Sequence, residues 1–155
     1  MKNKVFISFL ITFFIFVLII FYKALSNTNF YIPAIDQKRN IPQFSAPTFF
    51  DKKIIQSKDI FFEDKFYLLN IWSSWCVPCK EEHLFLMNLS KNEKIEIIGL
   101  NYKDKFKNAD KFINKLGNPY TKILIDRDGT KAIELGAFGV PETFLIYKNQ
   151  IIKKF

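Results

Sequence analysis

The segment Tyr67-Leu68-Leu69-Asn70-Ile71-Trp72-Ser73-Ser74-Trp75-Cys76-Val77-Pro78-Cys79 decides the fold of this chain. Residues 67–72 are apolar and β-prone apart from one amide, which predicts a buried strand. The residues that follow have apolar side chains at helical spacing, which predicts a helix from about Pro78 to Ser90. Cys76 and Cys79, the only two cysteines, therefore occupy a CxxC at a strand-to-helix turn, a position suited to thiol–disulfide exchange.

Cys76 is the expected nucleophile of this pair. A thiol at a helix N-terminus faces unpaired amides and the positive end of the helix dipole, which stabilise the thiolate. Cys79, one turn further along, is placed to resolve a mixed disulfide. The alternatives are a structural disulfide or half of a metal site. A bridge over two intervening residues constrains the unfolded chain little, and a zinc ribbon needs a second CxxC. We therefore expect neither a metal nor another cofactor.

Composition and charge narrow the class of protein. The 155 residues are enough for one domain of ordinary size with its own core. The formal net charge is +8, from 23 Lys and Arg against 15 Asp and Glu. The lysines alternate with acids, as in Lys103-Asp104-Lys105, and form no continuous basic stripe. We therefore expect no nucleic-acid partner.

The N-terminus has the pattern of a membrane anchor. Lys2 and Lys4 precede an apolar run over residues 5–22, which as a helix would be about 27 Å long, close to the thickness of a bilayer core. A secretory signal usually has a shorter apolar stretch, and Ala24-Leu25-Ser26 is a poor cleavage site. We predict a cytoplasmic stub at 1–4 and an uncleaved anchor at 5–22. The rest of the chain would then lie outside the cytoplasm.

The remaining chain is predicted to be a linker at 23–43 and one domain at 44–155. The expected order is a small hairpin near 49–55, a strand at 66–72, a helix at 78–90, a strand at 95–101, a helix at 109–116, a strand at 123–125, a short helix at 130–135 and a closing hairpin over 143–155. Strands that alternate with helices and end in a hairpin predict an α/β fold with a mixed sheet.

This order of elements is that of a thioredoxin-like fold, a central mixed sheet flanked by helices. Four local sequences make the likeness more specific: Trp75–His83 (WCVPCKEEH), Gly99–Asp104 (GLNYKD), Leu116–Tyr120 (LGNPY) and Gly139–Ile146 (GVPETFLI). Together they resemble the DsbE/CcmG-type thiol:disulfide interchange proteins of cytochrome c biogenesis. Chains of that family usually continue into another helix after the last hairpin, so the domain at 44–155 is expected to lack that helix.

The resemblance implies a single-pass protein of the bacterial inner membrane that faces the periplasm. It would keep the haem-attachment cysteines of apocytochrome c reduced, directly or through a maturation thiol protein. A membrane electron donor of the DsbD or CcdA type would recharge it. Two alternatives stay open: a general periplasmic thiol–disulfide oxidant or reductase, and a non-catalytic escort of apocytochrome or haem.

The resemblance also implies roles around a redox-active Cys76–Cys79 disulfide. In thioredoxin folds the proline corresponding to Pro141 has a cis peptide bond, packs against the disulfide and leaves a backbone edge that holds the substrate. Trp75, Val140 and Pro141 are therefore the expected substrate-docking residues, and Pro141 is also counted with the catalytic residues.

Two acids, Glu82 and Glu142, are the expected proton carriers. Many thioredoxins have a buried Asp six residues before the first cysteine, where Asn70 stands in this chain. Glu82 follows Cys79 by about one helical turn and could replace that Asp. Glu142 follows the loop proline and is expected to face the same cleft. In the resembled family, acids at both places characterise the active site.

Overall fold

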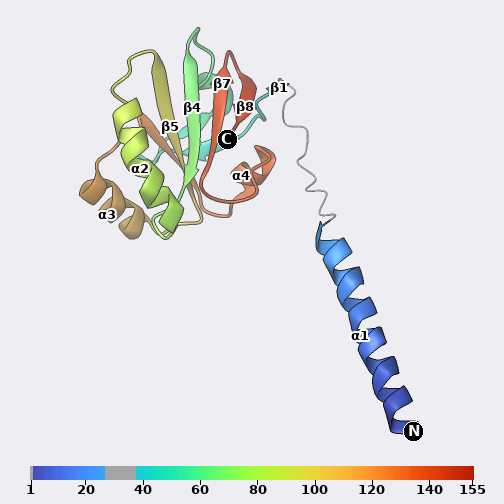
Figure 1. Cartoon of the computed structure of the whole chain (residues 1–155). Helices are drawn as coiled ribbons and strands as arrows, with labels where there is room; N and C mark the ends of the chain where they lie inside the picture. The colour runs from blue at the N-terminus through green and yellow to red at the C-terminus, as the bar shows by residue number, and fades with distance from the viewer. Residues whose placement is uncertain (1, 27–37) are drawn as a thin grey trace. The chain divides into compact units, whose positions relative to one another are not determined.

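A computed structural model describes residues 2–26 and 38–155, which belong to two separate units. The first unit contains the helix α1 (Lys2–Ser26), and the second is the α/β domain (Figure 1). Residue 1 of the predicted stub and residues 27–37 of the predicted linker lie outside the described residues.

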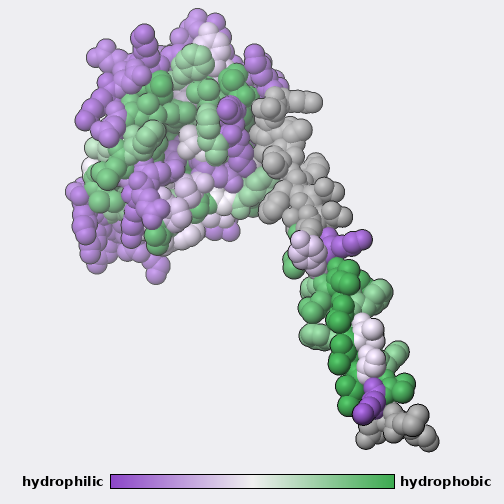
Figure 2. All heavy atoms as spheres, in the orientation of Figure 1, coloured by the Kyte–Doolittle hydropathy of each residue, from purple (hydrophilic) through white to green (hydrophobic). Residues whose placement is uncertain are grey.

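The helix α1 contains a segment, Lys4–Leu25, that is long and apolar enough to cross a membrane. Its 22 residues would be about 33 Å long, a length that matches a bilayer core of about 30 Å. The apolar side chains along the helix are exposed (Figure 2), and lipid is the solvent that would cover them. A signal sequence passes the same test of length and composition, so the uncleaved anchor stays a prediction.

A six-stranded mixed sheet is the centre of the domain (Figure 1). Three neighbouring strands on one side of the sheet are parallel to one another. The other three strands pair antiparallel with their neighbours. In spatial order the strands are β1 (Arg39–Asn40), β8 (Gln150–Lys154), β7 (Glu142–Tyr147), β4 (Phe66–Trp72), β5 (Ile95–Tyr102) and β6 (Lys122–Asp126). The predicted thioredoxin-like α/β fold is confirmed.

The other elements follow the predicted order, apart from a 3-10 helix that was not predicted. They are β2 (Ser45–Pro47), β3 (Ile54–Gln56), the 3-10 helix η1 (Ser57–Asp59), α2 (Val77–Leu89), α3 (Phe106–Leu116) and α4 (Thr130–Glu134). The pairing of β2 with β3 confirms the small hairpin, but its first strand was misplaced, since Phe49 and Phe50 lie in the turn. Phe49 is buried there and donates its amide to Ile123 of β6. The pairing therefore uses the residues before the aromatic pair.

Strand β4 is buried on both faces, which explains its almost unbroken apolar run. Leu69 and Ile71 pack in one core cluster, and Leu68 and Trp72 pack in another, which also contains both cysteines. Side chains alternate between the faces of a strand. Asn70 therefore points to the same face as Leu68 and Trp72, toward the cysteine pair.

The folded domain begins earlier than the expected residue 44. Strand β1, inside the predicted linker, pairs with β8, and Ile41 is buried. The guanidinium of Arg39 donates a hydrogen bond to the carbonyl of Leu135. A two-residue strand has no periodicity that a sequence pattern can reveal, so we place the start of the domain at Arg39.

Candidate active site

The cysteine pair forms a disulfide at the start of α2. Cys76 is the N-cap residue of this helix, and its Sγ accepts a hydrogen bond from the backbone amide of Cys79 at 3.1 Å. Both residues are buried, with 4% and 2% of their surface exposed. The helix dipole and the free amides of the first turn would stabilise a thiolate on Cys76 after reduction.

An acid after β5 holds the loop that leads to Cys76. The carboxylate of Asp104 accepts hydrogen bonds from the amide of Ser74 at 2.6 Å and from its hydroxyl at 2.9 Å. Trp75, 55% exposed, donates its indole N–H to the carbonyl of Lys103 at 3.1 Å. Asp104 and Ser74 were not predicted. Both follow parallel strands at their carboxyl ends, where an α/β sheet places its functional loops, and that rule could have found them.

The loop before β7 has the expected cis peptide bond between Val140 and Pro141. Both residues are half-buried, and Val140 packs against the core cluster that contains Cys76 and Cys79. The docking roles of Trp75, Val140 and Pro141 stay predictions.

Glu82 lies on the face of α2 that meets the sheet. Its carboxylate is half-buried and accepts a hydrogen bond from the side-chain amide of Asn70 at 2.7 Å. Burial raises the pKa of Glu82, and the bond from Asn70 opposes this in part. A half-buried carboxyl with a raised pKa, one turn from Cys79, is suited to carry a proton.

A buried network orients the Asn70 amide toward Glu82. Its oxygen accepts from the hydroxyl of Tyr120 at 2.8 Å, and its nitrogen also donates to the hydroxyl of Thr143 at 3.0 Å. Burial raises the pKa of Tyr120 well above its ordinary value, so its hydroxyl stays protonated and donates. Tyr120 and Thr143 were not predicted to have a role. The single amide inside an apolar strand was the signal that polar partners lie nearby.

Glu142 does not face the cysteines as we expected. One carboxylate oxygen accepts from the amides of Phe138 and Gly139, at 2.7 and 3.1 Å, and the other pairs with the ammonium of Lys154 at 2.6 Å. Glu142 is opposite Ile71 in the sheet, whereas Thr143 is opposite Asn70. Adjacent residues of a strand point to opposite faces, so the side chain of Glu142 belongs to the other face. Its contacts fix the loop before the cis peptide bond.

His83 is a packing residue. It is buried, its Nε2 lies 3.0 Å from the carbonyl of Gly117, and its ring meets Phe112 edge-on. Burial lowers the pKa of His83. Within residues 2–26 and 38–155, no group of three or more His, Cys, Asp or Glu side chains is arranged to hold a metal ion.

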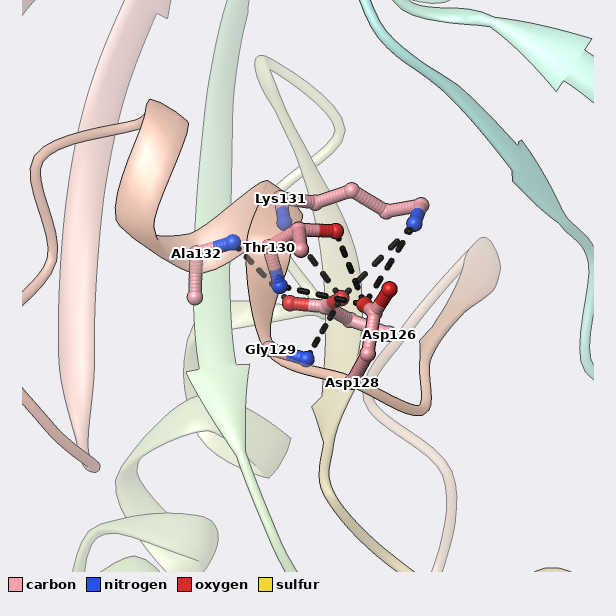
Figure 3. Close-up of polar contacts among 6 residues, drawn as sticks. All are labelled: Asp126, Asp128, Gly129, Thr130, Lys131 and Ala132. Atoms are coloured by element: carbon pink, nitrogen blue, oxygen red, sulfur yellow. Dashed lines mark hydrogen bonds and ion pairs between the residues drawn. The ribbon is translucent and has the colours of Figure 1, made fainter.

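The buried acid Asp126 anchors α4 (Figure 3). Its carboxylate accepts hydrogen bonds from the amides of Gly129, Lys131 and Ala132, at 3.1, 3.4 and 2.9 Å. Burial raises the pKa of Asp126. Asp128 is exposed in the same loop, and its bonds from the amide and hydroxyl of Thr130 lower its pKa to about 2. These bonds order the turn between β6 and α4.

A CxxC at the start of a helix, beside a cis-proline loop and on a mixed sheet, defines a thiol–disulfide protein of the thioredoxin fold. The chain belongs to the Redoxin family, which residues 37–155 match. It is 39% identical to the thiol:disulfide interchange protein DsbE of Escherichia coli K12 over 113 residues, 73% of this chain and 60% of that protein. It is 43% identical to CycY of Rhizobium leguminosarum bv. viciae over 88 residues, 57% of this chain and 47% of that protein.

A solved structure of a DsbE protein from Chlorobium tepidum agrees in fold. Its TM-score is 0.62 at 24% identity, over 77% of this chain and 84% of that one. The matched region spans about half to three-fifths of the length of the two curated relatives named above.

Replacing Glu82 with glutamine is expected to lower the rate of disulfide reduction by about 100-fold, the usual contribution of a positioned acid or base. The pKa of Glu82 is raised above 4.5, so the wild-type rate should rise with pH as this carboxyl ionises and becomes able to accept the Cys79 proton. The Glu82→Gln variant should lack that rise. The measurement is the first-order rate at which the mixed disulfide releases the substrate thiol, as a function of pH.

The matched control for this prediction is Glu81→Gln, which removes the same charge from the exposed neighbour on α2. It should keep both the rate and the pH profile of the wild type. Superimposable profiles for the Glu82 and Glu81 variants would show that Glu82 carries no proton in the reaction.

Proposed function

We propose that the protein is a membrane-anchored periplasmic thiol:disulfide oxidoreductase that acts as a reductant in cytochrome c maturation. The observation that carries this proposal is the Cys76–Cys79 disulfide at the N-terminus of α2, with the half-buried Glu82 one turn beyond it. The similarity to DsbE and CycY supports it. The apolar helix α1 supports the anchor.

The proposed cycle consists of two thiol–disulfide exchanges. The Cys76 thiolate attacks a substrate disulfide, so that one substrate sulfur leaves as a thiolate and a mixed disulfide forms. Cys79 loses its proton to Glu82 and attacks the Sγ of Cys76, which releases the second substrate thiol. The substrate gains two electrons and the protein is left with the Cys76–Cys79 disulfide, the form that the structure contains. A membrane electron donor of the DsbD or CcdA type would return the pair to dithiol.

The proposed substrates are the haem-attachment cysteines of apocytochrome c or a maturation thiol protein that acts on them. The lysines before α1 favour an orientation with the N-terminus in the cytoplasm. The domain would then face the periplasm of a bacterial inner membrane, where these substrates lie. Both points rest on the resemblance and on the sequence pattern.

The experiment that tests the proposal uses Cys79→Ala in the full, membrane-embedded chain. Without the resolving thiol, Cys76 should stay bound to its partner in a mixed disulfide. Adducts would be separated on a non-reducing gel and identified by mass spectrometry. We expect one or two adducts, with apocytochrome c or a maturation thiol protein.

The same gel separates the alternatives. A ladder of unrelated exported proteins would indicate a general oxidant or reductase. If no adduct forms while a double cysteine variant still supports cytochrome c assembly, the protein would be a non-catalytic escort. The Cys76→Ala, Cys79→Ala variant is the control for adducts that do not involve the CxxC.

A further inference from the structure

Two cavities are connected by the loop that carries Trp75. One, about 430 Å³, lies against Phe49, Phe106 and Asp104. The other, about 360 Å³, lies against Trp75 and Phe112. The loop before Cys76 joins them, because Ser74 and Trp75 of the second cavity bond to Asp104 and Lys103 of the first. We call the lining of both cavities the Trp75 face.

The Trp75 face carries six basic side chains, all exposed: Lys80, Lys103, Lys105, Lys111, Lys115 and Arg127. Asp104 is the one acid in the lining, and hydrogen bonds from Ser74, Asn101 and the amide of Lys105 already engage its carboxylate. The net charge of the face is therefore strongly positive and is not compensated by its own residues.

Among the described residues, acids outside the Trp75 face do not pair with its basic side chains either. In the part of the chain that the structure describes, none of the six forms an ion pair. Lysines elsewhere do form them: Lys65 and Lys122 share Glu96, and Lys154 pairs with Glu142. These six unpaired charges lie in the cavity linings that the loop before Cys76 connects.

The face also has an apolar anchor point. Trp75 is 55% exposed and Phe106 is 46% exposed, and a Trp ring supplies a large contact area with one polar edge. Exposed Trp rings that are ringed by polar groups are common anchors in protein interfaces. An extended segment with acidic residues near its cysteine would complement both properties of this face.

We infer that the Trp75 face is the docking site for an acidic segment of the substrate protein, next to the disulfide that Cys76 attacks. The inference rests on the proposed function. Opposite charges speed the encounter and fix its orientation. The face thereby selects disulfides that have Asp or Glu beside them, and leaves the exchange chemistry to the CxxC.

The test measures reduction of three disulfide peptides by the reduced full chain in detergent micelles. The peptides share one Cys-x-x-Cys core and have acidic, neutral or basic flanks. At low ionic strength the acidic peptide should react about 10-fold faster than the neutral one, and salt at about 0.5 M should abolish the difference. In a triple variant, Lys111→Gln, Lys115→Gln and Arg127→Gln, most of the preference should be lost.

A second triple variant is the matched control: Lys58→Gln, Lys91→Gln and Lys94→Gln remove the same net charge from exposed positions outside the two cavities. It should keep the preference of the wild type. Equal losses in the two triple variants, or equal rates for acidic and neutral peptides in the wild type, would overturn the inference.

Two further readouts keep this inference separate from the proposed function. Reduction of oxidised 2-mercaptoethanol, a small uncharged disulfide, should be the same in the wild type and both triple variants, since it reports the exchange chemistry alone. Binding of the acidic peptide with serine in place of its cysteines, followed by Trp fluorescence, reports docking without chemistry. If the small disulfide is not reduced, the proposed function fails, and binding of the serine peptide still tests the docking site. Weaker binding in the first triple variant alone supports the docking site. Unchanged binding in that variant overturns it.

Discussion

Changing Cys76 to serine is expected to lower the single-turnover rate of disulfide reduction by about 1000-fold or more. A hydroxyl at the N-cap of α2 would keep the helix start, because serine is a good N-cap residue, but it cannot attack a disulfide. The loss would therefore come from chemistry. Rapid acid quenching of a reaction between the reduced chain and a disulfide peptide measures it.

The companion variant Cys79→Ser should behave differently. Cys76 would still attack at a rate close to that of the wild type, and the reaction would stop at the mixed disulfide. If Cys79→Ser blocked the first step and Cys76→Ser did not, the nucleophile would be Cys79 and the order of attack would be the reverse of the one we propose.

Changing Asp126 to alanine is expected to lower the free energy of unfolding by about 2 kcal/mol. Three backbone amides lose their acceptor, at about 1 kcal/mol each, and removing a buried carboxylate offsets part of that loss. The change corresponds to a melting temperature about 8 °C lower for a domain of this size. The measurement is thermal unfolding in detergent, followed by the fluorescence of the buried Trp72.

The raised pKa of Asp126 determines how the stability of the wild type changes with pH. The pKa of Asp126 in the fold is above its ordinary 3.8, so the wild type loses stability as the pH rises through the window that begins near 3.8. The alanine variant has no such loss. The difference in stability between the two should therefore be largest below that window and smaller at neutral pH.

Asp128→Ala is the matched control for the Asp126 prediction, since Asp128 is an exposed acid in the same turn that bonds to Thr130, to the side chain of Asp126 and, weakly, to Lys131, and accepts no amide of α4 beyond Thr130. Its loss should be clearly smaller. Equal losses for the two variants would mean that the anchoring of α4 does not depend on the buried carboxylate.

The sequence predicted the order of the elements well because they carry strong local signals. The double-sided burial of β4 gives a continuous apolar run, and Pro78 in the first turn of α2 marks where the helix begins. Strand β1 has only two residues, and long-range pairing with β8 creates it. No local pattern could have indicated it.

Of the site residues, the sequence identified those that are close to the cysteines along the chain. It could place Glu82 by counting one helical turn, and the structure gives Glu82 a raised pKa. It misplaced Glu142, because the face to which β7 directs this side chain depends on the register with β4. Tyr120 lies 50 residues from Asn70 in the chain, so only the fold brings these two side chains together.

Strand β8 and the residue after it contact residues that support Glu82. Phe155 exchanges two backbone hydrogen bonds with Thr143, the residue that bonds to Asn70. Lys154 binds Glu142 and the carbonyl of Gly136. Loss of these contacts would therefore loosen Thr143 and, through Asn70, the position of Glu82.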